Sequence, residues 1–190
     1  MKAHSHVGAS SATRWMNCPG SVRLSEGIES RSSKYAAEGT VAHLLGEEAL
    51  AKRKPLKQWL GKIVEQDGFK IEVTQEMIDA VRVYVDTVRE DYARGDDLTV
   101  EHKFHIKDLH EALYGTNDAS IFKKKAKKLI VYDYKHGQGV AVEVENNAQL
   151  KYYAIGALME TGFPATEVEM VIVQPRCAHP DGPVRRWPCS

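Results

Sequence analysis

The sequence has few cysteines, no excess of charge of either sign and no long apolar run. Its three cysteines, Cys18, Cys177 and Cys189, are too few and too widely spaced for a disulfide framework. No apolar run approaches the roughly 18 residues that a membrane-spanning helix needs. The first 15 residues also lack the continuous apolar segment of a signal peptide. These absences lead us to expect a protein of the reducing cytoplasm.

The charge balance limits how a nucleic acid could bind. Basic and acidic residues number 26 each, so no positive field surrounds the whole molecule. A nucleic-acid partner would have to be held by local basic patches. The composition is otherwise that of a globular protein, because 43% of the residues are hydrophobic and 27% are charged. With 190 residues, we expect one domain over 1–190, with residues 1–13 as a loose N-terminal arm.

Helical periodicity dominates the first half of the chain. A helix is predicted over about 40–54, followed by a polar, glycine-containing region to about residue 72. Thr74 then begins a long amphipathic helix, for which Gly95 is the expected C-cap. The apolar stripe of this helix consists of Met77, Val81, Val85, Val88 and Tyr92.

The second half changes to the period of strands. Three strands are predicted as a meander over 98–106, 115–122 and 129–136, and a short fourth over 140–145. A helix follows, capped by Asn146 or Asn147 and closed by Gly162, and a last strand covers about 168–176. This order predicts an α/β or α+β fold with a mixed central β-sheet flanked by helices.

One hairpin brings charged residues together. If the chain turns between Lys125 and Ala126, Asp118 lies opposite Asp133, and Lys135 lies on the same face. Two carboxylates about 5 Å apart repel each other by about 1 kcal/mol or more, and a divalent cation such as Mg²⁺ would compensate. The alternative is that Asp118 caps a turn while Asp133 and Lys135 face solvent.

Four motifs in order resemble those of a known superfamily. They are "EGTVAH" at 38–43, "GTND" at 115–118, "DYK" at 133–135 and "QLKYY" at 149–153. Together they resemble the PD-(D/E)XK nuclease superfamily in its RecB-like exonuclease branch. The sequence is also similar to an uncharacterised phage and prophage family of that branch, over roughly residues 9–176.

The resemblance implies a restriction-endonuclease-like core and a site that holds one or two Mg²⁺ or Mn²⁺ ions. Lys135 would assist the attacking water, and Gln149 and Tyr153 would lie beside the reacting groups. The implied metal ligands are His43, Asp118, Asp133 and the backbone carbonyl of Tyr134.

Several residues near these motifs have two interpretations. Glu47 lies one turn after His43, and Glu101 lies on the first predicted strand, so either is a weaker candidate ligand or a partner for a lysine. Tyr153 is either a site residue or an aromatic residue of the core. Cys18 matches an iron–sulfur ligand of some RecB-like proteins, but the other ligands are incomplete, so no cluster is expected.

Basic residues suggest where DNA would bind. The run "KKKAKK" at 123–128 falls at the hairpin turn, where it either contacts phosphates or forms a solvated tip. Arg14 and Trp15 either bind a terminal phosphate and a base or pack the N-terminal segment. The candidate DNA-binding residues are Arg14, Lys124, Lys125 and Lys127.

The sequence therefore predicts a metal-dependent deoxyribonuclease, most simply an exonuclease in phage recombination, repair or DNA processing. DNA is its expected partner, together with a phage recombination protein in a bacterial host cell. The alternative is a non-catalytic nucleic-acid-binding module that kept the nuclease fold.

Overall fold

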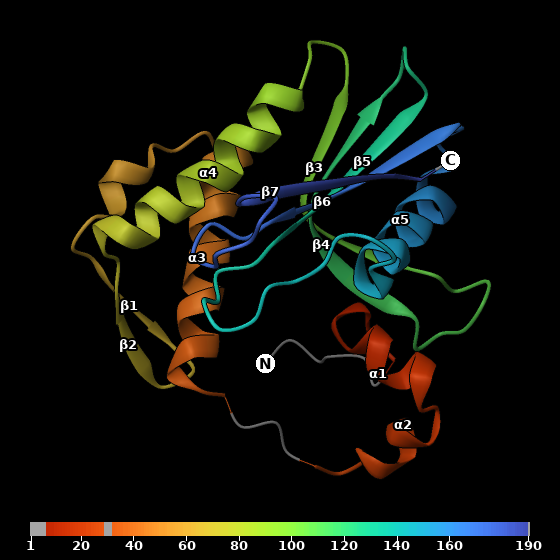
Figure 1. Ribbon diagram of the computed structural model, residues 1–190, viewed down its shortest axis with the longest axis horizontal. Helices are drawn as coiled ribbons and strands as arrows, with labels where there is room; N and C mark the ends of the chain where they lie inside the picture. Colours follow the sequence, from red (N-terminus) through yellow and green to blue (C-terminus); the bar gives the residue numbers. More distant parts are fainter. Residues whose placement is uncertain (1–6, 29–31, 190) are drawn as a thin grey trace.

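The computed structural model describes residues 7–28 and 32–189 (Figure 1). Its centre is a five-stranded mixed sheet in the order β3-β4-β5-β6-β7, in which only β5 and β6 run parallel. The strands are β3 (Asp97–His105), β4 (Tyr114–Lys123), β5 (Lys128–Tyr134), β6 (Glu167–Val173) and β7 (Val184–Cys189). The predicted α+β fold with a mixed sheet flanked by helices is confirmed.

Helices cover both faces of the sheet, and each face has its own core. On one face, α3 (Lys34–Leu50) and α4 (Gln75–Asp91) pack on residues such as Ile121, Ile130 and Tyr132. On the other face, α5 (Ala148–Thr161) packs on residues such as Leu129 and Val131. The alternation of side chains along each strand separates the two cores.

The strand register agrees with the sequence-based prediction. β4 and β5 pair from Ala119 opposite Tyr132 to Lys123 opposite Lys128, which is the register that a turn between Lys125 and Ala126 requires. The helical crossover α5 then returns the chain beside β5 as the parallel strand β6. Asn147 caps α5 by accepting a hydrogen bond from the Leu150 amide, and Gly162 ends it with φ of 63°.

Three predicted boundaries were wrong in the first half. The helix expected over 40–54 is α3, which begins at Lys34 because Ser33 caps it. The region before Thr74 contains the short helix η2 (Leu56–Trp59) and a hairpin of β1 (Ile63–Gln66) and β2 (Phe69–Glu72). The helix from Thr74 ends at Asp91, so Gly95 is not its C-cap.

The strand predicted over 140–145 is instead an irregular segment held by buried side chains. Gln174 donates to the carbonyls of Gly137 and Val140 and accepts from the Val142 amide. Arg185 donates to the Val142 carbonyl and to Gln174. These side chains bond backbone groups that a neighbouring strand would otherwise bond. Residues 140–145 therefore form no strand, although their sequence alternates.

The N-terminal segment is packed over its described part. Residues 1–6 lie outside the described residues, but Ala9 and Ala12 are buried, in η1 (Ala9–Ser11) and α1 (Ala12–Asn17). Both elements contact α5, and the short helix α2 (Gly20–Leu24) follows. The expected loose arm is therefore wrong for residues 7–13. Within the described part of the chain, no helix has the length and apolarity needed to cross a bilayer.

Candidate metal centre

Three potential metal ligands meet where α3 passes the middle of β3 and β4. They are His43 of α3, Glu101 of β3 and Asp118 of β4, and one ligand atom from each lies within 4.8 Å of the others. His43 Nδ1 lies 3.4 Å from Asp118 Oδ1 and 3.6 Å from Glu101 Oε1. An imidazole with two carboxylates is a donor set that suits Mn²⁺ and related divalent cations.

The charges of this triad are strongly linked. Burial by itself would lower the pKa of His43, but the carboxylates of Asp118 and Glu101 outweigh it and raise that pKa to about 10. Burial opposes ionisation of Asp118, yet His43, the Tyr134 amide and Lys135 together hold the pKa of Asp118 below its usual value. In the absence of a metal, the triad is therefore held together as an imidazolium between carboxylates.

The backbone at Glu101 is strained. Its φ is 47°, a left-handed conformation that few residues other than glycine adopt. The β3–β4 ladder pairs Val100 with Ala119 and His102 with Asn117 but omits the pair between them, Glu101 and Asp118. The two ladder segments keep one register, so the interruption is local. Such strain costs about 1–3 kcal/mol and is found most often at functional sites.

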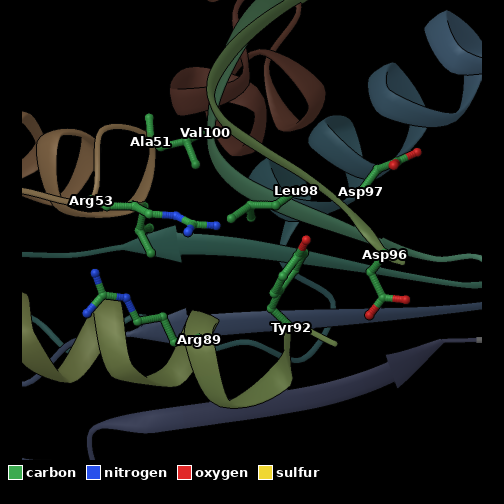
Figure 2. A pocket seen from close by; sticks show the side chains of 9 residues that line it. Ala51, Arg53, Arg89, Tyr92, Asp96, Asp97, Leu98 and Val100 are labelled. Atoms are coloured by element: carbon green, nitrogen blue, oxygen red, sulfur yellow. The ribbon is translucent and has the colours of Figure 1, made fainter. Parts of the chain in front are cut away.

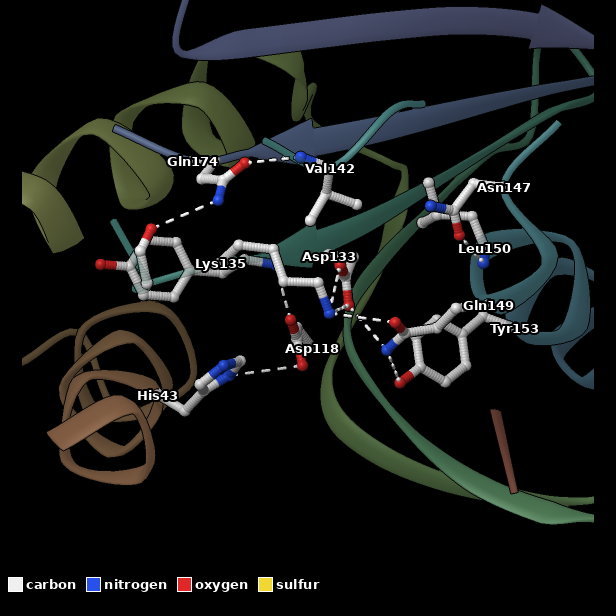
Figure 3. A network of polar contacts seen from close by, with 12 residues as sticks. His43, Asp118, Asp133, Lys135, Val142, Asn147, Gln149, Leu150, Tyr153 and Gln174 are labelled. Atoms are coloured by element: carbon white, nitrogen blue, oxygen red, sulfur yellow. Dashed lines mark hydrogen bonds and ion pairs between the residues drawn. The ribbon is translucent and has the colours of Figure 1, made fainter. Parts of the chain in front are cut away.

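A second group of polar side chains lies next to the triad (Figure 3). Lys135 Nζ lies 2.8 Å from Asp133 Oδ2 and donates to Gln149 Oε1 at 3.0 Å. Gln149 Nε2 donates to Asp133 Oδ1 at 3.0 Å and to the Tyr153 hydroxyl at 2.8 Å. Gln149 and Tyr153 are four residues apart on α5, so both reach the sheet from the same helix face.

Asp133 and Lys135 are perturbed in different ways. Burial raises the pKa of Asp133 to about 6, because the effect of Lys135 only partly offsets it and Asp118 adds to it. Burial disfavours the charge of Lys135, but Asp133 and Asp118 raise the pKa of its ammonium group above the usual value. Lys135 is thus positively charged at neutral pH. The neighbouring carboxylate, Asp133, has a pKa close enough to neutrality to gain or lose a proton there.

Tyr134 links the triad to the core below it. Its amide donates to Asp118 Oδ2 at 2.7 Å, its ring stacks on Tyr84, and His43 meets it edge-on at 5.4 Å. Its hydroxyl bonds His136 Nδ1 at 2.7 Å, and His136 in turn meets Glu38 of α3. Burial and the nearby Arg176 lower the pKa of His136 to about 4, so this histidine is neutral at pH 7.

The structure thus groups the predicted residues in a way that the sequence did not specify. Asp118 lies with His43 and Glu101, whereas Asp133 lies with Lys135 and Gln149. Glu101, the weaker candidate, belongs to the triad, and Glu47 does not. Ligation by Asp133 and by the Tyr134 carbonyl stays a prediction. The sequence left Glu101 and Glu47 as equally weak candidates, because strand alternation alone does not show whether Glu101 faces His43 and Asp118.

The predicted DNA-binding residues have mixed surroundings. Lys124 forms an ion pair with Asp97 at 2.8 Å, and Lys125 and Lys127 are exposed in the turn. Arg14 donates to the Ser21 carbonyl and to Ser25, which braces α2. Trp15 donates to the Gly8 carbonyl and meets Tyr152 edge-on, so it packs the N-terminal segment.

Comparison with known proteins places the chain in a family. A family described as "Protein of unknown function (DUF2800)" matches residues 4–183. The chain belongs to the DUF2800 family. A solved structure titled "Crystal structure of SSO0001" is similar to this DUF2800 chain at 12% identity and a TM-score of 0.26. That alignment covers 94% of this chain and 77% of the other, and its low score supports no argument about activity.

Proposed function

We propose that the chain is a metal-dependent DNA nuclease of the PD-(D/E)XK type, in the RecB-like branch. One observation carries the proposal: Lys135 is bonded to both Asp133 and Gln149 directly beside a three-residue set of metal ligands. The residues come from α3, β3, β4, β5 and α5, and three separate sequence motifs supply the two carboxylates, the lysine and the glutamine.

The donor set fits a divalent cation held by His43, Glu101 and Asp118. Three carboxylates, one lysine and a protonated His43 leave the region with one net negative charge. Replacing the imidazole proton by a divalent cation brings that sum to zero. Asp133 Oδ2 is buried and, although it is ion-paired with Lys135 at 2.8 Å, it accepts no well-aligned hydrogen bond from a described residue, so it still has room for a further ligand. Mg²⁺ or Mn²⁺ would polarise a phosphate oxygen and lower the pKa of a bound water.

The neighbouring side chains could orient the attacking water and compensate the negative charge that develops on the phosphate. Lys135, fixed by Asp133 and Gln149, would hold the attacking water and stabilise negative charge on the phosphate. The water oxygen would attack phosphorus as the bond to the leaving oxygen breaks. Asp133, with its pKa of about 6, is suited to take the proton released from that water. Tyr153 would keep Gln149 in place through the hydrogen bond that its hydroxyl accepts from Gln149 Nε2.

The assignment as an exonuclease follows from the resemblance of the sequence motifs to the RecB-like branch. An exonuclease acting in phage recombination, repair or processing would need a free DNA end. Incubation with end-labelled linear DNA and with closed circular DNA, in Mg²⁺, Mn²⁺ or chelator, tests both the metal requirement and the need for an end. Metal-dependent loss of the linear form alone is the expected result.

Variants tie cleavage to the site. Asp118→Asn should abolish cleavage, and Lys135→Met should slow the chemical step by about 10²–10³-fold while Mn²⁺ binding changes little. Asp79→Asn and Lys62→Met are matched controls, because Asp79 is exposed on α4 and Lys62 stacks on Trp59 near β1. If the wild-type protein binds DNA but never cleaves it with any of these metals, the chain is instead a binding module.

A further inference from the structure

A groove separate from the metal centre lies between the ends of α3 and α4 and the start of β3 (Figure 2). Its volume is about 840 Å³. The floor is apolar and consists of Leu50, Leu98 and Val100, which pack on the core of that face. The rim carries Arg53, Arg89 and Tyr92, with Asp96 and Asp97 at the far end.

The two arginines of this groove carry positive charges that no carboxylate of the described residues pairs with. Arg53 is exposed and forms no hydrogen bond or ion pair with any described residue. Arg89 donates to the Ala49 carbonyl at the end of α3 but has no carboxylate partner in the described part of the chain. Figure 2 shows the guanidinium of Arg53 and the ring of Tyr92 both directed toward Leu98. A cation and an exposed aromatic ring thus face the same apolar floor.

The acidic residues of the rim are offset by lysines from the β4–β5 turn. Asp97 pairs with Lys124 at 2.8 Å, and its carboxylate points away from the groove in Figure 2. Asp96 accepts a hydrogen bond from the Ala93 amide and lies 3.9 Å from Lys123. The charge left for a ligand is therefore that of the two arginines, which favours an anion.

Parts of the groove lie close to the metal centre along the chain. Val100 of its floor directly precedes Glu101, and Leu50 lies seven residues after His43, which is two turns along the same helix face. That separation is about 10 Å along α3, the length of about three stacked nucleotides. An anionic chain bound at the triad would reach the groove within a few units.

We propose that this groove binds single-stranded DNA extending from the metal centre, with a base stacked on Tyr92 and phosphates held by Arg53 and Arg89. The proposal rests on the proposed nuclease function for the identity of the anion. An aromatic ring beside arginines over an apolar floor is the combination that binds single strands without sequence preference. The lysine turn at the far end would receive the next part of the strand.

Binding of a fluorescein-labelled 12-nucleotide oligothymidylate, followed by anisotropy in chelator at several salt concentrations, tests this. Arg53→Gln should weaken binding several-fold and lower the salt slope by about 0.7, the value for one lost phosphate contact on a single strand. Tyr92→Leu should weaken binding at least about fivefold and leave the slope unchanged, whereas Tyr92→Phe should bind normally. Arg82→Gln is the control, because Arg82 is an exposed arginine of the same helix that is paired with Asp79.

The outcomes separate this proposal from the nuclease assignment. If Arg53→Gln or Tyr92→Leu binds as the Arg82→Gln control does, or if the wild-type protein does not bind the oligothymidylate, the groove proposal is refuted. Since chelator prevents cleavage, binding is measured independently of activity. Loss of binding in both variants of a protein that never cleaves DNA would support the groove and refute the nuclease.

Discussion

Asp133 is the residue of the site whose ionisation responds to pH near neutrality. Its neighbours favour the protonated form in the absence of metal, since burial and Asp118 outweigh the attraction of Lys135. A carboxyl whose pKa is raised by folding stabilises the protein below its unfolded pKa, and this stabilisation is lost as the pH rises through the folded pKa. The proton on Asp133 therefore stabilises the folded protein at acidic pH, and this contribution is lost as the pH rises through about 6.

The free energy of unfolding in chelator should therefore fall by on the order of 2 kcal/mol between pH 4.5 and 6.5, relative to Asp133→Asn. His43 contributes little slope there, because its raised pKa adds a stability that is fully present below its unfolded pKa of about 6.5 and is lost as the pH rises from there to about 10. Urea unfolding of both proteins across this range measures the difference. Parallel pH profiles would show that Asp133 ionises normally.

At this scale, the hairpin register predicted Asp118, Asp133 and Lys135 as neighbours, and the family resemblance added Gln149. Glu101 was underrated for a physical reason. Its side chain reaches the triad because its backbone leaves the normal strand conformation, and no local pattern in "LTVEHKFH" encodes a φ of 47°. That conformation depends on the residues packed around it, which come from α3 and β4.

Among the elements, α5 carries Gln149 and Tyr153 and is seated by one close contact. Gly156 faces Phe104 of β3, and a Cβ placed on Gly156 would lie 2.1 Å from two carbons of that ring. Phe104 also meets Tyr153 edge-on, with ring centroids 5.9 Å apart. The absence of a side chain at position 156 thus sets how closely the helix approaches the sheet.

Gly156→Ala should destabilise the protein by about 1–3 kcal/mol, because the overlap with a buried ring outweighs the gain in helix propensity of about 1 kcal/mol. Cleavage should fall as well, since α5 must move and takes Gln149 with it. Adding Phe104→Leu should recover part of the stability, which a double-mutant cycle of thermal unfolding quantifies. Gly20→Ala is a control, because its added Cβ meets nothing within 4 Å. Additive effects of the two changes would contradict the contact.

Elements with strong local signals were predicted well, and those decided by distant residues were not. The N-cap of α4 is Thr74 and the caps of α5 are Asn147 and Gly162, as the sequence predicted, with Asn147 one of its two candidates. The alternation at 140–145 suggested a strand, but Gln174 and Arg185, far along the chain, determine its path. The β1–β2 hairpin was missed although Asp67 and Gly68, both with positive φ, form a typical tight turn.

For the whole molecule, the zero net charge means that affinity for the proposed DNA ligand would depend on which local basic residues the strand passes. The lysine turn (123–128) lies about 17 Å from Asp118 of the candidate metal centre, since five residues of β4 separate Asp118 from Lys123. That distance equals about five stacked nucleotides. Lys125 and Lys127 would therefore meet only the far part of a bound strand.

Replacing Lys125 and Lys127 by glutamine should leave the affinity for a 4-nucleotide strand unchanged and weaken that for a 15-nucleotide strand. The salt slope for the longer strand should fall by about 0.7 for each lost contact. Anisotropy titrations of both lengths in an Asp118→Asn background measure this without cleavage. Lys57→Gln with Lys62→Gln carries the same change of charge near β1 as a control. Equal loss at both lengths would place the lysines at the metal centre instead.

The position of the site between two cores has a consequence during synthesis on the ribosome. His43 belongs to a helix on one face of the sheet and Gln149 to the helix on the other, and β6 joins the sheet last but one. A nascent chain that has emerged only to residue 147 carries the triad, Asp133 and Lys135 but leaves one sheet face uncovered. Such a chain should not yet hold the side chains of the site in place, so the site would form only after α5 and β6 have emerged.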